Sequence, residues 1–137
     1  MQFPQTYKIT QDVVVSGFTD GGSTSGYIDL TSQLPARAIV KAWEIIVTAG
    51  FTGTGITSAA VMVGSDGDTD RFSADTAKSC IAAGTIASVP IAADVLDGFG
   101  TAQTIRVTVT GNADFAAIKT AGVGAMTVNV FFDLLPS

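Results

Sequence analysis

The residues with the clearest potential for chemistry are three aspartates at alternate positions, in the run Asp66-Gly67-Asp68-Thr69-Asp70. Three carboxylates at this spacing could converge on a hard cation such as calcium, as at the start of an EF-hand loop. The run then departs from that motif, because Arg71 stands where the sharp-turn glycine belongs and no glutamate follows to complete the site. We therefore favour a turn held by its own hydrogen bonds, and keep the three aspartates as a weak calcium candidate. No other residues suggest a metal or a cofactor.

The side chains on which most catalytic mechanisms depend are missing. The chain has no histidine and only one cysteine, Cys80, which removes the commonest general base, the commonest zinc ligand and any internal disulfide. The Gly-Ser-Thr-Ser-Gly run places Thr24 where a nucleophile elbow carries serine. A glycosidase needs two carboxylates at a defined separation, but Glu44 is the only glutamate. We expect no enzymatic activity and no catalytic or cofactor-binding residues.

Charge and hydropathy exclude two classes of partner. Seven Lys and Arg against twelve Asp and Glu give a formal net charge of -5, with no basic run, so the chain has little with which to displace counterions from nucleic acid. Gly, Ser, Thr or Asp interrupts every apolar stretch before the ~18 residues of a membrane span. We predict one domain over residues 1–137, made in a reducing cytosol and stable without a cofactor.

Apolar and polar residues alternate in several segments, as in half-buried β-strands. The clearest are Thr104–Thr110 and Met126–Asp133. Ala38–Thr48 is apolar on both sides, with Ile39 expected on the face of Trp43, and predicts a central strand covered on both faces. Weaker or shorter strands are expected at Gln5–Thr10, Val13–Val15, Tyr27–Leu30, Ala59–Val63 and Ile86–Val89.

Strands separated by loops rich in Gly, Ser, Thr and Asp predict an all-β fold, an antiparallel β-sandwich. An eight-stranded jelly roll is the favoured topology, and a barrel of different strand order is the alternative. One short helix is expected at Ser73–Ala83, with Ser73 as N-cap, Gly84 just beyond its end and Cys80 on its buried face.

Three loop aromatics, Phe18, Phe51 and Phe99, each follow a glycine. Such a ring either fills the end of a sandwich or stands exposed as a contact residue. We favour the first role and keep the second as a candidate interface.

Two strand aromatics also suggest an interface. Alternation places Phe131 on the face opposite Phe132, where it stays partly exposed unless a partner covers it. Trp43 lies on the strand with two apolar faces, which a partner could likewise cover.

The order of several segments carries a resemblance to a known family. These segments are Asp29-Leu30 to Leu34-Pro35, Ala38-Ile39-Val40 to Trp43–Val47, Phe51-Thr52-Gly53, Val61–Ser65 leading into Asp68–Phe72, and Thr120-Ala121-Gly122 before the last strand. They resemble small tailed-bacteriophage virion proteins, the capsid decoration (cement) proteins of the jelly-roll type. The resemblance implies a non-enzymatic structural protein on the capsid exterior, bridging subunits of the major capsid protein as a dimer or trimer.

A second interpretation comes from the loop aromatics alone. Phe18, Phe51 and Phe99 on glycine-rich loops could stack on sugar rings. The alternative function is therefore a carbohydrate- or receptor-binding module of a fibre or tail.

Overall fold

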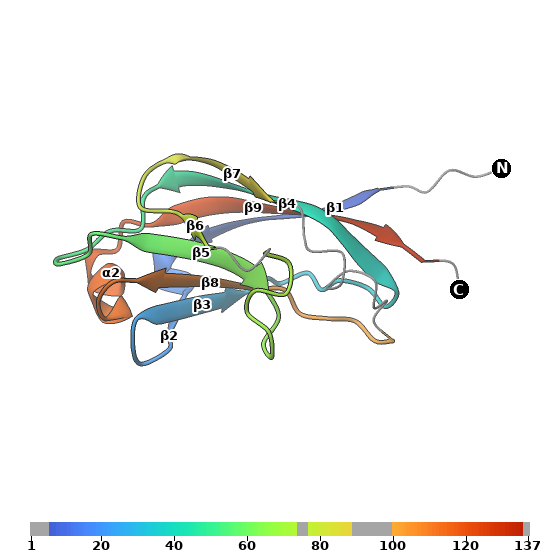
Figure 1. The fold of residues 1–137 in the computed structure, drawn as a ribbon, viewed down its shortest axis with the longest axis horizontal. Helices are drawn as coiled ribbons and strands as arrows, with labels where there is room; N and C mark the ends of the chain where they lie inside the picture. Colours follow the sequence, from blue (N-terminus) through green and yellow to red (C-terminus); the bar gives the residue numbers. More distant parts are fainter. Residues whose placement is uncertain (1–5, 74–76, 89–99, 136–137) are drawn as a thin grey trace.

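The computed structural model describes residues 6–73, 77–88 and 100–135. Its elements in chain order are β1 (Tyr7–Val14), the 3-10 turn η1 (Val15–Gly17), β2 (Thr19–Asp20), β3 (Ser25–Asp29), β4 (Ala38–Ala49), β5 (Ala59–Gly64), β6 (Lys78–Ser79), β7 (Gly84–Ser88), β8 (Arg106–Gly111), α2 (Phe115–Ala121) and β9 (Ala125–Leu134). The strands form two stacked layers, with α2 at one end and the start of β1 and the end of β9 at the other (Figure 1). The predicted antiparallel β-sandwich with one short helix is confirmed. No helix in the described ranges is long and apolar enough to cross a membrane.

The strand order is that of a jelly roll. One sheet runs β1-β9-β4-β7 and the other β2-β3-β8-β5-β6. Apart from the short β2, the strands pair from the two ends of the chain inward. β1 pairs with β9, β3 with β8, β4 with β7, and β5 with β6. These pairs form one long antiparallel hairpin, which the contacts of β4 with β9 and of β5 with β8 roll into two sheets.

The core fills the space between the two sheets. In β8 and β9 every second side chain points inward, and the inward residues Val107, Val109, Val128 and Val130 are fully buried. Their outward neighbours are mostly polar, as in a strand that buries one face. Both strongly alternating segments therefore form the strands that their patterns predict.

Strand β4 departs from the predicted pattern. Its pairing with β9 shifts between Val40 and Ala42, so β4 carries a bulge there. The extra residue turns Val40 and Trp43 toward the core, while Ile39 stays only partly buried and does not share the face of Trp43. The outer face is not covered by a further layer of described residues, because Ile46 remains 37% exposed. The expectation that Ile39 shares the face of Trp43 was wrong because of this bulge, whereas cover of the outer face by a partner stays a prediction.

The helix lies elsewhere than predicted. The Ser73 hydroxyl accepts from the Val63 amide (2.6 Å) and donates to the Val63 carbonyl oxygen (3.1 Å), so it binds β5 instead of capping a helix. The segment continues as β6 beside β5, with 74–76 outside the described residues. The helix is α2, where Asp114 accepts from the Ala116 amide at 3.0 Å and Gly122 ends the helix at φ +66. The prediction of a helix at Ser73–Ala83 was wrong because pairing with β5 outweighs a local capping signal.

Candidate functional site

The outer face of the β2-β3-β8-β5-β6 sheet carries a band of uncharged side chains. Two rows cross the sheet: Tyr27 and Met62 flank Thr108, and Ser25 and Ala60 flank Thr110. We call these six residues the uncharged band. The Ser25 and Thr110 hydroxyls bond each other at 2.7 Å. Three strands thus position six side chains from distant parts of the chain on one face of the sheet.

The centre of the band is Thr108. Only 6% of this residue is exposed, and its Oγ1 has no hydrogen-bond partner among the described residues. A buried hydroxyl without a partner carries a desolvation cost. The band is therefore closely packed at its middle, with the two largest side chains, Tyr27 and Met62, on either side.

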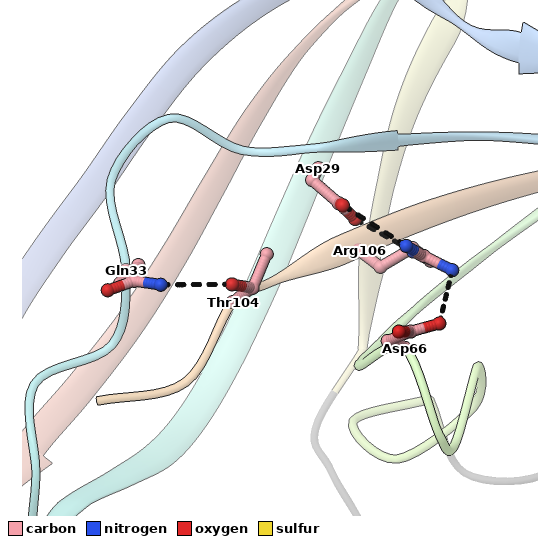
Figure 2. A network of polar contacts seen from close by, with 5 residues as sticks. All are labelled: Asp29, Gln33, Asp66, Thr104 and Arg106. Carbon is pink, nitrogen blue, oxygen red and sulfur yellow. Dashed lines mark hydrogen bonds and ion pairs between the residues drawn. The ribbon is translucent and has the colours of Figure 1, made fainter. Parts of the chain in front are cut away.

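An arginine at the end of the band is held by two carboxylates (Figure 2). Arg106 donates from Nε to Asp29 Oδ1 (2.7 Å) and from Nη2 to Asp29 Oδ2 (3.1 Å), and its Nη1 donates to Asp66 at 2.6 Å. The guanidinium carbon lies 3.9 Å from the ring centroid of Tyr27, a cation–π contact. The hydrogen bond to Asp29 is the main cause that raises the pKa of Arg106 above its ordinary value. The charge at this end of the sheet is thus paired within the chain.

The same network ties together three connections. Asp29 ends β3, Arg106 begins β8 and Asp66 lies in the loop after β5. Beside them, Gln33 Nε2 donates to Thr104 Oγ1 at 3.0 Å, joining the loop before β4 to the segment before β8 (Figure 2). These contacts link the connections at one end of the sheet to each other.

The other outer face, on the β1-β9-β4-β7 sheet, has a different character. Hydrogen bonds between side chains run across it: Thr10 donates to Asn129 (2.8 Å), and Asn129 donates to Glu44 (3.1 Å). Thr127 donates to Asp12 at 2.6 Å on the neighbouring row. Phe131 lies on this face, half-buried, with Lys8 and Ala42 opposite it on the flanking strands. It keeps the partial exposure expected of an interface candidate.

Three of the four remaining predicted interface aromatics, Trp43, Phe18 and Phe51, lie in the core. Trp43 is 1% exposed, and its Nε1 donates to the Phe72 carbonyl oxygen at 2.6 Å. The rings of Phe18 and Phe51 are buried edge-on at 5.3 Å between centroids, and close the end of the sandwich beside α2. Neither ring offers a face to a sugar, which removes the basis of the carbohydrate-binding alternative at these two positions. Phe99 lies outside the described residues.

The aspartate run forms a turn. Asp66 pairs with Arg106, and the Asp68 carbonyl oxygen accepts from the Ser65 amide at 2.8 Å. Within the described ranges, no three His, Cys, Asp or Glu side chains are grouped so as to hold a metal, and no pocket is found. The structure therefore does not bring Asp66, Asp68 and Asp70 together as a calcium site.

Cys80 lies in the core beside β5, where its amide donates to the Ala59 carbonyl oxygen. Burial raises the pKa of its thiol to about 12. The thiol is protonated near neutral pH, as expected of a small buried hydrophobic residue.

The members of the uncharged band were not identified from the sequence. Alternation in Thr104–Thr110 already placed Arg106, Thr108 and Thr110 on one face. The pattern could not indicate that Tyr27 and Met62 lie beside Thr108, because that depends on which strands pair with β8.

Comparison with known proteins finds similarity in fold and no match in sequence family. No protein-family profile and no curated protein matches the chain. Among solved structures, it matches a chain in the capsid asymmetric unit of cyanophage Pam1 with a TM-score of 0.54 and 17% identity, over 96% of this chain and 86% of that one. It matches a chain in the capsid of Ralstonia phage GP4 with a TM-score of 0.55 and 16% identity, over 97% and 86%. A chain of Tomato Aspermy Virus matches with a TM-score of 0.53 and 12% identity, over 96% and 79%. The fold is one found in viral capsids.

Proposed function

We propose that this chain is a structural protein of a bacteriophage virion, and specifically a decoration (cement) protein that binds the outer surface of the head. The observation that carries the proposal is the jelly-roll fold, which is similar to chains in two phage capsids over 96–97% of this chain and 86% of each of those chains. The resemblance of the sequence to decoration proteins points the same way.

The uncharged band is the surface best suited to bind the shell. Cores of protein interfaces are enriched in Tyr, Met and Arg and depleted in Lys, Glu, Asp, Ser and Ala. The enriched types in the band are Tyr27 and Met62, which lie beside the paired Arg106. The side chains around them, Ser25, Ala60 and Thr110, have few rotatable bonds. They therefore lose little conformational entropy when a partner covers them.

Binding at this surface stabilises the shell by linkage. A protein that bridges two capsid subunits binds the assembled shell and not the separated subunits, so it shifts the equilibrium toward assembly. Because the same contact is repeated at many sites of the capsid lattice, each individual contact can be weak. The role requires no reaction at any residue.

The chemistry of the chain is compatible with the capsid exterior. The formal net charge of -5 at pH 7 disfavours contact with the packaged genome and keeps particles apart. The proposed partner is the major capsid protein, and the proposed location is the outer surface of a virion assembled in the host cytoplasm.

The test is binding of the purified protein to expanded heads that lack it. We expect retention at a fixed stoichiometry, with a higher melting temperature of the heads. Retention no greater than on unrelated particles of the same size would overturn the decoration role.

Two variants test whether the uncharged band is the surface that binds the heads, which is a separate question from whether the protein binds them. Met62→Glu places a charge in the uncharged band and should weaken retention about tenfold or more, whereas Thr48→Glu places the same charge on the outer face of the other sheet and should not. Thr19→Glu, at an exposed position beside Tyr27, replaces the first variant if its melting curve shows loss of fold. Equal retention of the band variant and the control would show that another surface binds the heads.

A further inference from the structure

Strand β1 is a long open edge. It pairs with β9 over eight consecutive positions without a register shift, and no other described strand pairs with it. The edge strands β2 and β6 have two residues each and β7 has five. Proteins usually protect such an edge with proline, a bulge, a very short strand or charged side chains. β1 is long and has no proline or bulge, so Lys8 and Asp12 are its only features of this kind.

The two charged residues of β1 have no ionic partner among the described residues. Both Lys8 and Asp12 are exposed on the outer face, and the ion pairs of the described residues involve neither. They lie four residues apart on one strand, about 13 Å, which is too far for a direct contact. Asp12 accepts one hydrogen bond, from Thr127, through a single carboxylate oxygen.

The sequence of β1 is complementary to itself about Thr10. When two copies of the strand pair antiparallel around a two-fold axis at Thr10, Lys8 of each copy lies opposite Asp12 of the other, and Thr10 lies opposite Thr10. On the inner face, Tyr7 lies opposite Val13. Opposite charges, Thr–Thr pairs and aromatic–β-branched pairs are the cross-strand combinations that stabilise a sheet.

This register is the only one that pairs the charges. Residues opposite each other in an antiparallel sheet point to the same side, so the axis must pass through a residue position. An axis at Lys8 or Asp12 places like charges opposite each other, and an axis at Ile9 or Gln11 leaves both charges opposite uncharged residues.

We propose that a second copy of this chain binds along the edge of β1, with the two-fold axis at Thr10. The contact joins the two β1-β9-β4-β7 sheets into one continuous sheet, an isologous dimer. Main-chain hydrogen bonds supply the attraction, and the Lys8–Asp12 pairs set the register.

The geometry of this dimer connects it to the proposed function. A two-fold axis between paired edge strands is perpendicular to the sheet, so both copies turn the uncharged band to the same side. The dimer would then be a bivalent clamp, for which neighbouring binding sites raise the effective concentration. This connection rests on the proposed function, whereas the dimer itself does not.

Charge reversal tests the register in solution, without capsids. Sedimentation should show a reversible dimer of the unmodified chain. Lys8→Asp and Asp12→Lys each place like charges opposite each other and should weaken dimerisation at least about tenfold. The double variant should restore it, and an equimolar mixture of the two single variants should form a heterodimer. Lys41→Asp, an equal change at an exposed residue of β4, is the control and should leave the dimer unchanged.

Disulfide trapping tests the position of the axis. Cys80 is buried, so Thr10→Cys introduces the accessible thiol. The opposed Cα atoms would lie about 4.5–5.5 Å apart, within the range that a disulfide spans, and oxidation should yield a covalent dimer. Val14→Cys places the two thiols about 27 Å apart and should not. Any of three results would overturn the proposal. The unmodified chain could stay monomeric at about 1 mM, the charge variants could dimerise as the control does, or the two cysteine variants could crosslink equally.

Discussion

The ring of Phe51 lies directly over the backbone of Gly124. A Cβ at position 124 would lie 2.6 Å from Cγ and Cδ2 of Phe51, closer than packed carbon atoms approach. The ring has little room to withdraw, because it packs edge-on against Phe18 at the closed end of the sandwich. This glycine is required by the close approach of an aromatic ring to the start of β9.

Gly124→Ala should therefore destabilise the fold. We expect a loss of about 1–3 kcal/mol in the free energy of unfolding, the usual cost of overpacking, measured by denaturant titration. Gly67→Ala is the control, because an added Cβ there meets nothing within 4 Å, and it should change stability by less than about 0.5 kcal/mol. Equal effects of the two variants would contradict the packing argument.

The two carboxylates on Arg106 should contribute unequally. Asp29 forms two hydrogen bonds with the guanidinium and its side chain is 40% exposed, whereas Asp66 forms one and is 81% exposed. Asp29→Asn should cost about 1 kcal/mol and Asp66→Asn less than about 0.5 kcal/mol, because solvent screens exposed pairs. Thermal melts at low and high salt provide the measurement. An Asp66→Asn loss as large as that of Asp29→Asn would refute this ranking.

Trp43 should be a buried structural residue. Trp43→Phe removes the Nε1 donor to the Phe72 carbonyl oxygen and leaves a cavity in the core, so we expect a loss of about 2 kcal/mol or more. Tyr7→Phe, which removes a hydroxyl from a 40% exposed side chain, should have an effect below about 0.5 kcal/mol. The tryptophan emission of the unmodified protein should shift to longer wavelength on unfolding. A native spectrum typical of a solvent-exposed indole would contradict the burial of Trp43.

Cys80 should make stability depend on alkaline pH. Its pKa is raised from 9.0 to about 12 by burial, so the unfolded chain loses the thiol proton before the folded chain does. The stabilisation is complete below the unfolded pKa and falls above about pH 9, by up to about 1.4 kcal/mol per pH unit. Urea titrations of the unmodified protein and of Cys80→Ala give the measurement, and the stability advantage of the cysteine should shrink as the pH rises toward about 11. An advantage that stays constant over this range would exclude the linkage.

Local patterns predicted the strands that bury one face. The alternation in Thr104–Thr110 and Met126–Asp133 survives in β8 and β9, because a strand with one face in the core must place every second side chain inward. The same reasoning failed in Ala38–Thr48. One bulge in β4 inverts the alternation, and no residue type marks the position of that bulge.

The helix shows how long-range pairing overrides a local signal. The types and spacing of Ser73, Lys78 and Gly84 are those of the caps and final turn of a helix. In the structure, the Ser73 hydroxyl instead binds the backbone of β5, and Lys78 begins β6, which pairs with β5. A hydrogen bond to a neighbouring strand competes directly with a helical cap.

The amino-acid sequence by itself determined an antiparallel sandwich, the inward faces of its strongly alternating strands, and a chain without histidine. Only the tertiary structure decided that Tyr27, Thr108 and Met62 form one surface, that Phe18 and Phe51 close the end of the core, and that Arg106 holds Asp29 and Asp66 together. The reason is physical: side-chain alternation is a property of a single strand, whereas the neighbours of that strand are selected by the pairing of segments far apart in the chain.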